Sequence, residues 1–395
     1  MKIVFAMDSM KGCLSSLECG EAAAQGLLRA IPNAQYSVRP LADGGEGTVS
    51  AVTMGCDGEF VEVETVNPLG EKMYAQYGII YNDENIKTAI IEIASAAGLT
   101  LVHENERDPL KTTTYGVGIL INDALDRGCR SFIIGLGGSA TNDVGIGMLQ
   151  ALGVDFIDEN GHIITGEIGH LTGSDLEFIS DIDTSHMNPL VFESNFRVAC
   201  DVKNPLIGEN GASHIFGPQK GLFVSEITMM DKWIQSFAQL VEKKSEEPVD
   251  PFTPGVGAAG GLGFAFKYLV KGSLEAGNKI VIEETNLIEY IKDADIVVTG
   301  EGFLDNQTKM GKAPIGIAEI AKKHNKTVIA LVGGVSASFD GDELPNVDAY
   351  FPIQRRPSSK KNAMDPVTTK INLSATSEQV FRLIKSTYFN ISTTK

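Results

Sequence analysis

Runs of mostly apolar residues near the two ends of the chain place the strongest constraint on its fold. They are KIVFAM (2–7), IVVTG (296–300) and TVIALV (327–332), with KIVIEE (279–284) and AYFPI (349–353) as further strand candidates. A strand that faces water on one side alternates apolar and polar residues, whereas an uninterrupted apolar run is typical of a parallel sheet covered on both faces. Segments with helical spacing separate these runs. We therefore predict an α/β fold with a doubly wound, mostly parallel sheet built from both chain ends.

The middle of the chain has a different pattern. Two alternating runs in residues 59–80 flank the turn NPLG and predict a hairpin of an antiparallel sheet. A chain of 395 residues is long enough for two domains. We predict a discontinuous first domain of residues 1–75 with 275–395, and an inserted mixed α/β domain of residues 76–274. We expect the active site in the cleft between them and hinges near residues 72–84 and 248–258.

Composition excludes several classes of partner. The formal net charge is -18, and no basic run is longer than KK or RR, which argues against binding to nucleic acid or to an anionic membrane. No apolar stretch reaches 18 residues, the five cysteines show no C-x-x-C spacing, and the six histidines show no metal-binding spacing. We expect a soluble cytoplasmic protein, a monomer or homodimer, whose partners are small molecules.

Five glycine-containing loops carry ionisable or amide side chains directly after apolar runs. They are DSMKG (8–12), LADGGEGT (41–48), GLGGSATND (135–143), DVKNPLIGENGASHIFGPQKG (201–221) and TGEGFLDNQTKMGKAPIG (299–316). One such loop is typical of a solvated turn. Together the five supply the lysines, carboxylates and backbone N–H groups that phosphoryl transfer requires. The P-loop motif and the dinucleotide-binding G-x-G-x-x-G after the first strand are both missing, which excludes two common nucleotide-binding classes.

With PGVGAAGGLGF (254–264), these loops resemble the ordered motif set of the type-1 glycerate kinase family over residues 1 to about 380. The resemblance implies ATP-dependent phosphorylation of D-glycerate and favours 2-phosphoglycerate over 3-phosphoglycerate as the product. The carboxylates of the loops indicate Mg²⁺ as the accompanying ion. It also implies a discontinuous two-domain α/β architecture. Four positions depart from the family pattern without loss of an ionisable group: Met10 for Phe, Cys13 for Ser, Val144 for Gly and Val256 for Ala.

Residue types within the loops suggest individual roles. Asp8 or Asp201 is the candidate base toward the glycerate hydroxyl, and two lysines are the candidate cations. The candidate catalytic residues are thus Asp8, Lys11, Asp201 and Lys220. The candidate substrate- and phosphate-binding residues are Ser9, Gly137, Gly138, Ser139, Thr141, Asn142, Asn204, Gln219 and Lys312. The candidate metal ligands are Asp43, Glu46, Glu301 and Asp305.

Two alternative functions are compatible with these loops. GLGGSAT is similar to the G-L-x-S-S-A loop of galactokinase-like kinases, although its second serine is missing. A non-catalytic sugar-acid sensor on the same fold is the other alternative, against which the ionisable side chains in every loop argue. Turnover of D-glycerate with ATP and Mg²⁺ separates an enzyme from a sensor.

Overall fold

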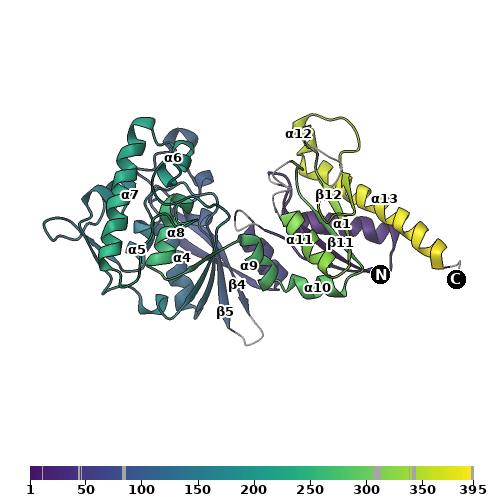
Figure 1. The fold of residues 1–395 in the computed structure, drawn as a ribbon, viewed down its shortest axis with the longest axis horizontal. Helices are drawn as coiled ribbons and strands as arrows, with labels where there is room; N and C mark the ends of the chain where they lie inside the picture. The colour runs from purple at the N-terminus through teal and green to yellow at the C-terminus, as the bar shows by residue number, and fades with distance from the viewer. Residues whose placement is uncertain are drawn as a thin grey trace. The chain divides into compact units, whose positions relative to one another are not determined.

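The structure is a computed structural model that describes residues 1–10, 12–42, 45, 47–81, 86–305, 313–337, 339 and 344–392. The chain forms two compact units: unit 1 is Met1–Asp43 with Val281–Lys395, and unit 2 is Gly44–Ile280. Several helices and strands of both units are labelled in Figure 1.

Unit 1 contains a parallel five-stranded sheet in the order β13-β12-β11-β1-β2. Its strands are β1 (Lys2–Met7), β2 (Gln35–Val38), β11 (Ile296–Gly300), β12 (Thr327–Val332) and β13 (Ala349–Pro352). Its helices are α1 (Ser16–Ala30), α10 (Leu287–Asp293), α11 (Ala313–Lys323), α12 (Lys360–Ala363) and α13 (Pro366–Ser392). The predicted doubly wound sheet made from both chain ends is confirmed.

Helices cover both faces of this sheet. Successive residues of a strand point to opposite sides, and because those of β1 are apolar on both sides, each face is buried under helices. On β1, Ile3 and Phe5 belong to the apolar cluster that α1 and α13 complete. Val4 and Ala6 belong to a second cluster, with residues of α10 and α11. The two helices from opposite ends of the chain, α1 and α13, pack side by side (Figure 1), so closely that a Cβ at Gly26 would lie 2.2 Å from the Ser374 carbonyl oxygen.

Unit 2 contains a mixed six-stranded sheet in the order β10-β9-β6-β5-β4-β3. Its strands are β3 (Glu59–Val66), β4 (Lys72–Tyr81), β5 (Lys87–Glu92), β6 (Ser131–Gly135), β9 (Asn195–Ala199) and β10 (Ser273–Glu275). Strands β7 (Asp155–Ile157) and β8 (Asp181–Asp183) form a separate antiparallel pair. The helices are α2 (Thr48–Gly55), α3 (Ala94–Ala97), α4 (Tyr115–Asp126), α5 (Ile146–Ala151), α6 (Ala212–Phe216), α7 (Val224–Lys244) and α8 (Ala258–Tyr268).

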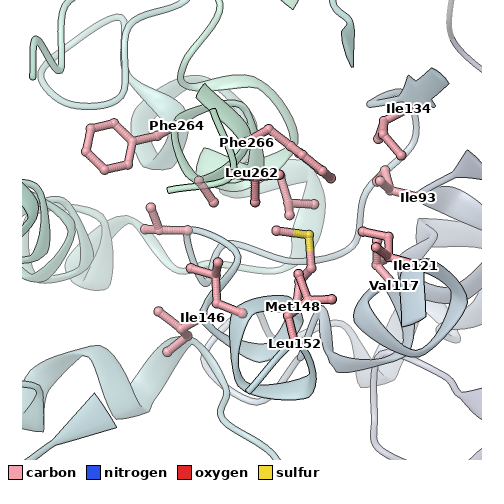
Figure 2. Close-up of a cluster of buried hydrophobic side chains, with 14 of the residues drawn as sticks. Ile93, Val117, Ile121, Ile134, Ile146, Met148, Leu152, Leu262, Phe264 and Phe266 are labelled. Carbon is pink, nitrogen blue, oxygen red and sulfur yellow. The ribbon is translucent and has the colours of Figure 1, made fainter. Parts of the chain in front are cut away.

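One large apolar core joins the sheet of unit 2 to its helices. Ile93 and Ile134, at the carboxyl ends of β5 and β6, lie near Val117 and Ile121 of α4 (Figure 2). Met148 of α5 lies between α4 and α8 in the same cluster. Apart from the 21-residue α7, the helices listed for unit 2 have at most 12 residues, so their stability comes from this burial rather than from intrinsic propensity. The core therefore holds the loops that follow β5 and β6 in place.

The position at which the chain first passes from unit 1 to unit 2 differs from the predicted domain boundary. The sequence places it at residue 75, whereas the structure places it after Asp43. Strands β3 and β4 pair antiparallel from Glu59 with Ile79 to Val66 with Lys72, so the hairpin cannot be divided between two domains. Residues 72–81, predicted as part of a hinge, are strand β4 itself.

The second crossing, after Ile280, falls within α9 (Gly277–Glu284). The run KIVIEE, predicted as a strand, lies in this helix. A short apolar run does not distinguish a strand from a buried helical turn. Here Ile282 packs with α10 and α11 against the sheet of unit 1.

Candidate active site

The sheet of unit 1 has a topological switch point between β1 and β11. Numbered along the chain, its strands follow the order 2-1-3-4-5, so the connections leave β1 toward opposite faces and a crevice opens at the carboxyl ends of the two central strands. The backbone N–H of Asp8 donates to the Gly300 carbonyl at 2.9 Å, which joins the loops after β1 and β11. Asp8 and Ser9 therefore lie on one side of the crevice, and Glu301 begins the loop on the other.

Carboxylates dominate this crevice. The Glu301 side chain is only 7% exposed, and its backbone carbonyl accepts the N–H of Gly333 at 3.0 Å, which also ties in the loop after β12. The Asp8 carboxylate accepts the N–H of Ser9 at 2.7 Å. Asp305 is half-buried four residues further along the Glu301 loop. Carboxylate oxygens are the ligands that Mg²⁺ prefers, so the chemistry of these side chains suits that ion.

The described ranges contain no group of three or more His, Cys, Asp or Glu side chains arranged to hold a metal. Two of the predicted metal ligands, Asp43 and Glu46, lie outside the described residues, as do the predicted lysines Lys11 and Lys312. Of the predicted metal set, the structure thus describes Glu301 and Asp305, both on the loop after β11.

Sequence reasoning missed a cation at the same edge of the sheet. Arg39 follows β2 directly, and its backbone N–H donates to the Phe5 carbonyl of β1 at 2.8 Å. Its guanidinium lies 3.6 Å from the ring centroid of Tyr290 on α10, in a cation–π contact. The signal was available, because Arg39 lies only two residues before the glycine-rich loop LADGGEGT (41–48).

Unit 2 presents a second loop cluster where the parallel strands β5, β6 and β9 end. Gly137, Gly138 and Ser139 follow β6, and within the described chain their backbone N–H groups donate to no other residue. Gly138 has φ +76°, a left-handed conformation that glycine adopts without strain. Consecutive N–H groups in such a turn form a concave site for an anion. The predicted substrate- and phosphate-binding residues 137–142, called the anion loop below together with Asp143, therefore have suitable geometry.

Lys220 reaches this loop although it lies 79 residues after Thr141 and 81 residues after Ser139 in the sequence. Its ammonium donates to the Ser139 hydroxyl at 2.7 Å and to the Thr141 carbonyl at 2.6 Å, and the side chain is only 2% exposed. Burial lowers the pKa of Lys220 to about 7, and the negative charge of Asp143 opposes that shift. The structure thus brings the predicted Lys220, Ser139 and Thr141 together.

Two polar atoms of the same loop have no partner within the described part of the chain. They are the Thr141 hydroxyl oxygen and the Asn142 side-chain oxygen, both buried. The Asn142 amide donates to the Ser213 hydroxyl of α6 at 2.8 Å, which fixes its orientation. Unmatched buried polar atoms are costly in a folded protein, so they are suited to pairing with a substrate.

Asp143 fixes the position of the anion loop. Its buried carboxylate accepts the N–H and hydroxyl of Thr114, at 2.9 and 2.7 Å, and the N–H of Gly145 at 3.1 Å. Burial raises the pKa of Asp143, and these hydrogen bonds act in the opposite direction. The hydroxyl of Thr112 donates to the Ala140 carbonyl at 3.2 Å. The run TTT (112–114) is therefore a support for the loop that the sequence did not reveal.

The glycine-rich segment 254–264 packs against the back of the anion loop. The Gly260 carbonyl accepts the N–H of Val144 at 3.0 Å, and a Cβ at Gly260 would lie 2.1 Å from the Thr141 carbonyl oxygen. These glycines serve close backbone packing. Val144, one of the departures from the family pattern, has φ +53°, which is unusual for a β-branched residue.

The remaining predicted site residues lie on the long loop after β9. The Asn204 amide donates to the Asn210 carbonyl at 2.9 Å, and its own carbonyl accepts the N–H groups of Gly255 and Gly257. The Asp201 carboxylate accepts the N–H of Gly277, the first residue of α9, at 3.0 Å. Gln219 is exposed. Asn204 therefore has a structural role within its loop, and Asp201 holds the start of α9.

Comparison with known proteins decides the family. A sequence model of the glycerate kinase family matches residues 3–385. The chain is 45% identical to the Glycerate kinase of Haemophilus influenzae over 353 residues, 89% of this chain and 91% of the relative. It is also 45% identical to the Glycerate 2-kinase of Escherichia coli, over 89% of this chain and 90% of the relative. A crystal structure described as a glycerate kinase 2 from Salmonella typhimurium superimposes with a TM-score of 0.87 at 41% identity, covering 98% of this chain and 99% of the other.

The chain belongs to the glycerate kinase family. The family expected from the loop motifs is confirmed, and the α/β fold agrees with that of the solved relative. Among the described residues, no helix is both long and apolar enough to span a membrane.

Proposed function

We propose that this glycerate kinase family member transfers the γ-phosphoryl group of ATP to the 2-hydroxyl of D-glycerate. The observation that carries the proposal is the anion site of unit 2. Three backbone N–H groups there lack protein acceptors within the described chain, beside a buried lysine and two buried polar atoms without partners. This set matches a small anion that also carries hydroxyl groups, as glycerate does.

The roles of the residues follow from what each can supply. The N–H groups of Gly137–Ser139 and the Lys220 ammonium bind the carboxylate, while Thr141 and Asn142 orient the hydroxyl-bearing carbons. Fixing the carboxylate restricts the adjacent 2-hydroxyl more than the terminal 3-hydroxyl, because the latter is one rotatable bond further away. A well-positioned hydroxyl loses less entropy on reaching the transition state.

The phosphates of ATP fit the crevice of unit 1. Glu301, which follows Gly300 next to the Asp8 backbone, would hold Mg²⁺, which supplies charge neutralisation at the β- and γ-phosphates when it is bound. Arg39 adds a permanent positive charge at the same edge. Asp8 or Asp201 accepts the proton of the attacking hydroxyl. Asp8 is the stronger candidate because it lies at the switch point of the unit 1 sheet, where its backbone joins the loops after β1 and β11, whereas the Asp201 carboxylate holds the start of α9.

The reaction is tested with purified protein, ATP, Mg²⁺ and D-glycerate. We expect turnover, with 2-phosphoglycerate identified directly by ³¹P NMR. Accumulation of 3-phosphoglycerate as the first product would overturn the regiochemistry alone. Binding of D-glycerate without turnover would instead indicate a sensor, and turnover of a neutral sugar in its place would indicate the galactokinase-like alternative.

A further inference from the structure

Phe303 is an exposed aromatic residue in the loop after β11 of unit 1. It lies three residues beyond the end of β11, and its side chain is 53% exposed, whereas Glu301, two residues earlier, is buried. Leaving half of a phenylalanine ring in water forfeits hydrophobic stabilisation. An exposed ring beside a ligand crevice is therefore a candidate contact for an apolar or aromatic group of that ligand.

The backbone around Phe303 is held in place. Leu304 N–H donates to the Gly334 carbonyl at 3.0 Å, and Ser336 N–H donates to the Leu304 carbonyl at 2.8 Å. A Cβ at Gly334 would lie 3.1 Å from both Cδ2 and Cε2 of the Phe303 ring. A larger residue at position 334 would thus press on the ring. The loop after β12 supports one edge of the ring and leaves the rest accessible.

We propose that Phe303 is the stacking platform for the base of the phosphoryl donor, an adenine nucleotide, so that unit 1 binds the nucleotide and unit 2 binds glycerate. The inference rests on the proposed function and deepens it by assigning each substrate to one unit. Aromatic side chains stack on nucleobases through their π faces, which suits an exposed, supported phenylalanine ring.

The distance between the strands that lead to Phe303 and Arg39 agrees with this assignment. Strand β11, which leads to Phe303, and strand β2, which leads to Arg39, are separated only by β1. Neighbouring strands are about 4.8 Å apart, so the two loops begin about 10 Å from each other. A nucleotide can cross that distance with its base at Phe303 and its phosphates toward Asp8, Ser9 and Arg39. By contrast, Lys220 in unit 2 is almost completely buried and suits a small anionic group rather than a base.

A tryptophan introduced at this position reports base stacking directly. We expect the fluorescence of Phe303→Trp to be quenched saturably by ADP and ATP, and to be unaffected by D-glycerate. The native Trp233 lies on α7 in unit 2 and supplies a constant background. Phe192→Trp is the matched control, since Phe192 is 57% exposed in unit 2, and its fluorescence should not respond to nucleotide. No response at position 303, or a response to D-glycerate alone, overturns the proposal.

Steady-state kinetics give a second, independent test. We expect Phe303→Ala to raise the KM for ATP about 5- to 150-fold, the loss that corresponds to one base stacked on an aromatic ring. The KM for D-glycerate should change less than twofold, and Phe303→Tyr should restore most of the ATP affinity. An equal rise in both KM values, or a rise for D-glycerate alone, overturns the proposal. Nucleotide-dependent quenching without any D-glycerate turnover would overturn only the proposed function.

Discussion

At the scale of single residues, Lys220 combines two properties that are rarely found together. Its ammonium is almost completely buried, yet it has only one charged neighbour among the groups that shift its pKa, the Asp143 carboxylate. Removing a charge from water is expensive unless it is compensated. Burial of Lys220 therefore lowers the stability of the free protein, but it supplies a positive charge that can pair with a bound anion.

This cost predicts a pH-dependent stability. Because burial lowers the pKa of Lys220 from 10.5 to about 7, the unfolded chain binds one more proton than the folded chain between these values, and folding becomes more favourable as pH rises. Below pH 7 both states are protonated and the full cost remains. We expect the unfolding free energy of the wild type, relative to Lys220→Met, to rise by about 2–3 kcal/mol between pH 7 and 9 in urea titrations.

The control for this measurement is Lys232→Met, since Lys232 is an exposed residue of α7. The difference between the wild type and this control variant should stay constant with pH. If the difference between wild type and Lys220→Met also stays constant, Lys220 keeps its proton throughout, and the cost of its burial is small.

Val144 provides a second prediction at the residue scale. Its φ of +53° places a buried β-branched residue in the left-handed region, which costs about 1–2 kcal/mol for a residue with a Cβ. Val144→Gly and Val144→Ala both remove the isopropyl group, but only glycine removes the Cβ. We expect Val144→Gly to be about 1 kcal/mol more stable than Val144→Ala in urea unfolding.

Val117 is the matched control, because it is equally buried but lies in helix α4. There Val117→Ala should be more stable than Val117→Gly by about 1 kcal/mol. The same order of stability at position 144 as at position 117 would show that the left-handed conformation carries no strain.

At the scale of elements, the strand ends determine which carboxylate can act as the base. Asp8 follows β1 at the switch point, whereas the Asp201 carboxylate is bonded to the first N–H of α9. Asparagine keeps an oxygen that can accept this bond but loses basicity. The pair of Asp→Asn variants therefore separates a structural from a catalytic role.

We expect Asp8→Asn to lower kcat at saturating Mg²⁺ by about 10²- to 10⁴-fold, the usual contribution of a general base. Asp201→Asn should lower kcat by less than tenfold and leave the unfolding free energy unchanged, because the bond to Gly277 is retained. Steady-state assays at several Mg²⁺ concentrations distinguish these effects from the loss of a metal ligand. A larger effect at Asp201 than at Asp8 would reverse the assignment.

At the scale of the whole molecule, the proposed reaction needs groups from both units. The chain crosses between them after Asp43 and within α9, so each unit forms its own sheet and core. In-line transfer requires the hydroxyl oxygen and the γ-phosphorus to approach within about 3–3.5 Å. Water must also be excluded, since it competes with glycerate for the phosphoryl group.

We therefore expect the two units to close on their substrates. The radius of gyration from small-angle scattering should decrease when D-glycerate and a non-hydrolysable ATP analogue are both bound, and backbone amide exchange in residues 135–143 should slow. The protein with D-glycerate alone is the control. An unchanged scattering profile together with unchanged exchange would contradict a closing motion.

Much of the architecture was predictable because it depends on local patterns. Continuous apolar runs predicted β1, β11 and β12. The capping box that begins α1 is another local pattern, because Ser15 and Glu18 have the required spacing and the Glu18 N–H donates to the Ser15 hydroxyl at 3.2 Å. The run KIVIEE failed as a strand because a short apolar segment is compatible with either element. The boundary at residue 75 failed because composition does not reveal which strands pair.

The sequence alone determined the family, the doubly wound sheet and the residue types of the site loops. Only the tertiary structure decided which of those residues meet. Lys220 and Ser139 are 81 positions apart, and Leu304 donates a hydrogen bond to Gly334 in the loop after the next strand, because strand order brings these loops together at one edge of each sheet. The same burial that closes the core around Lys220 lowers its pKa, and burial depends on the packing of distant segments rather than on neighbouring residues in the sequence.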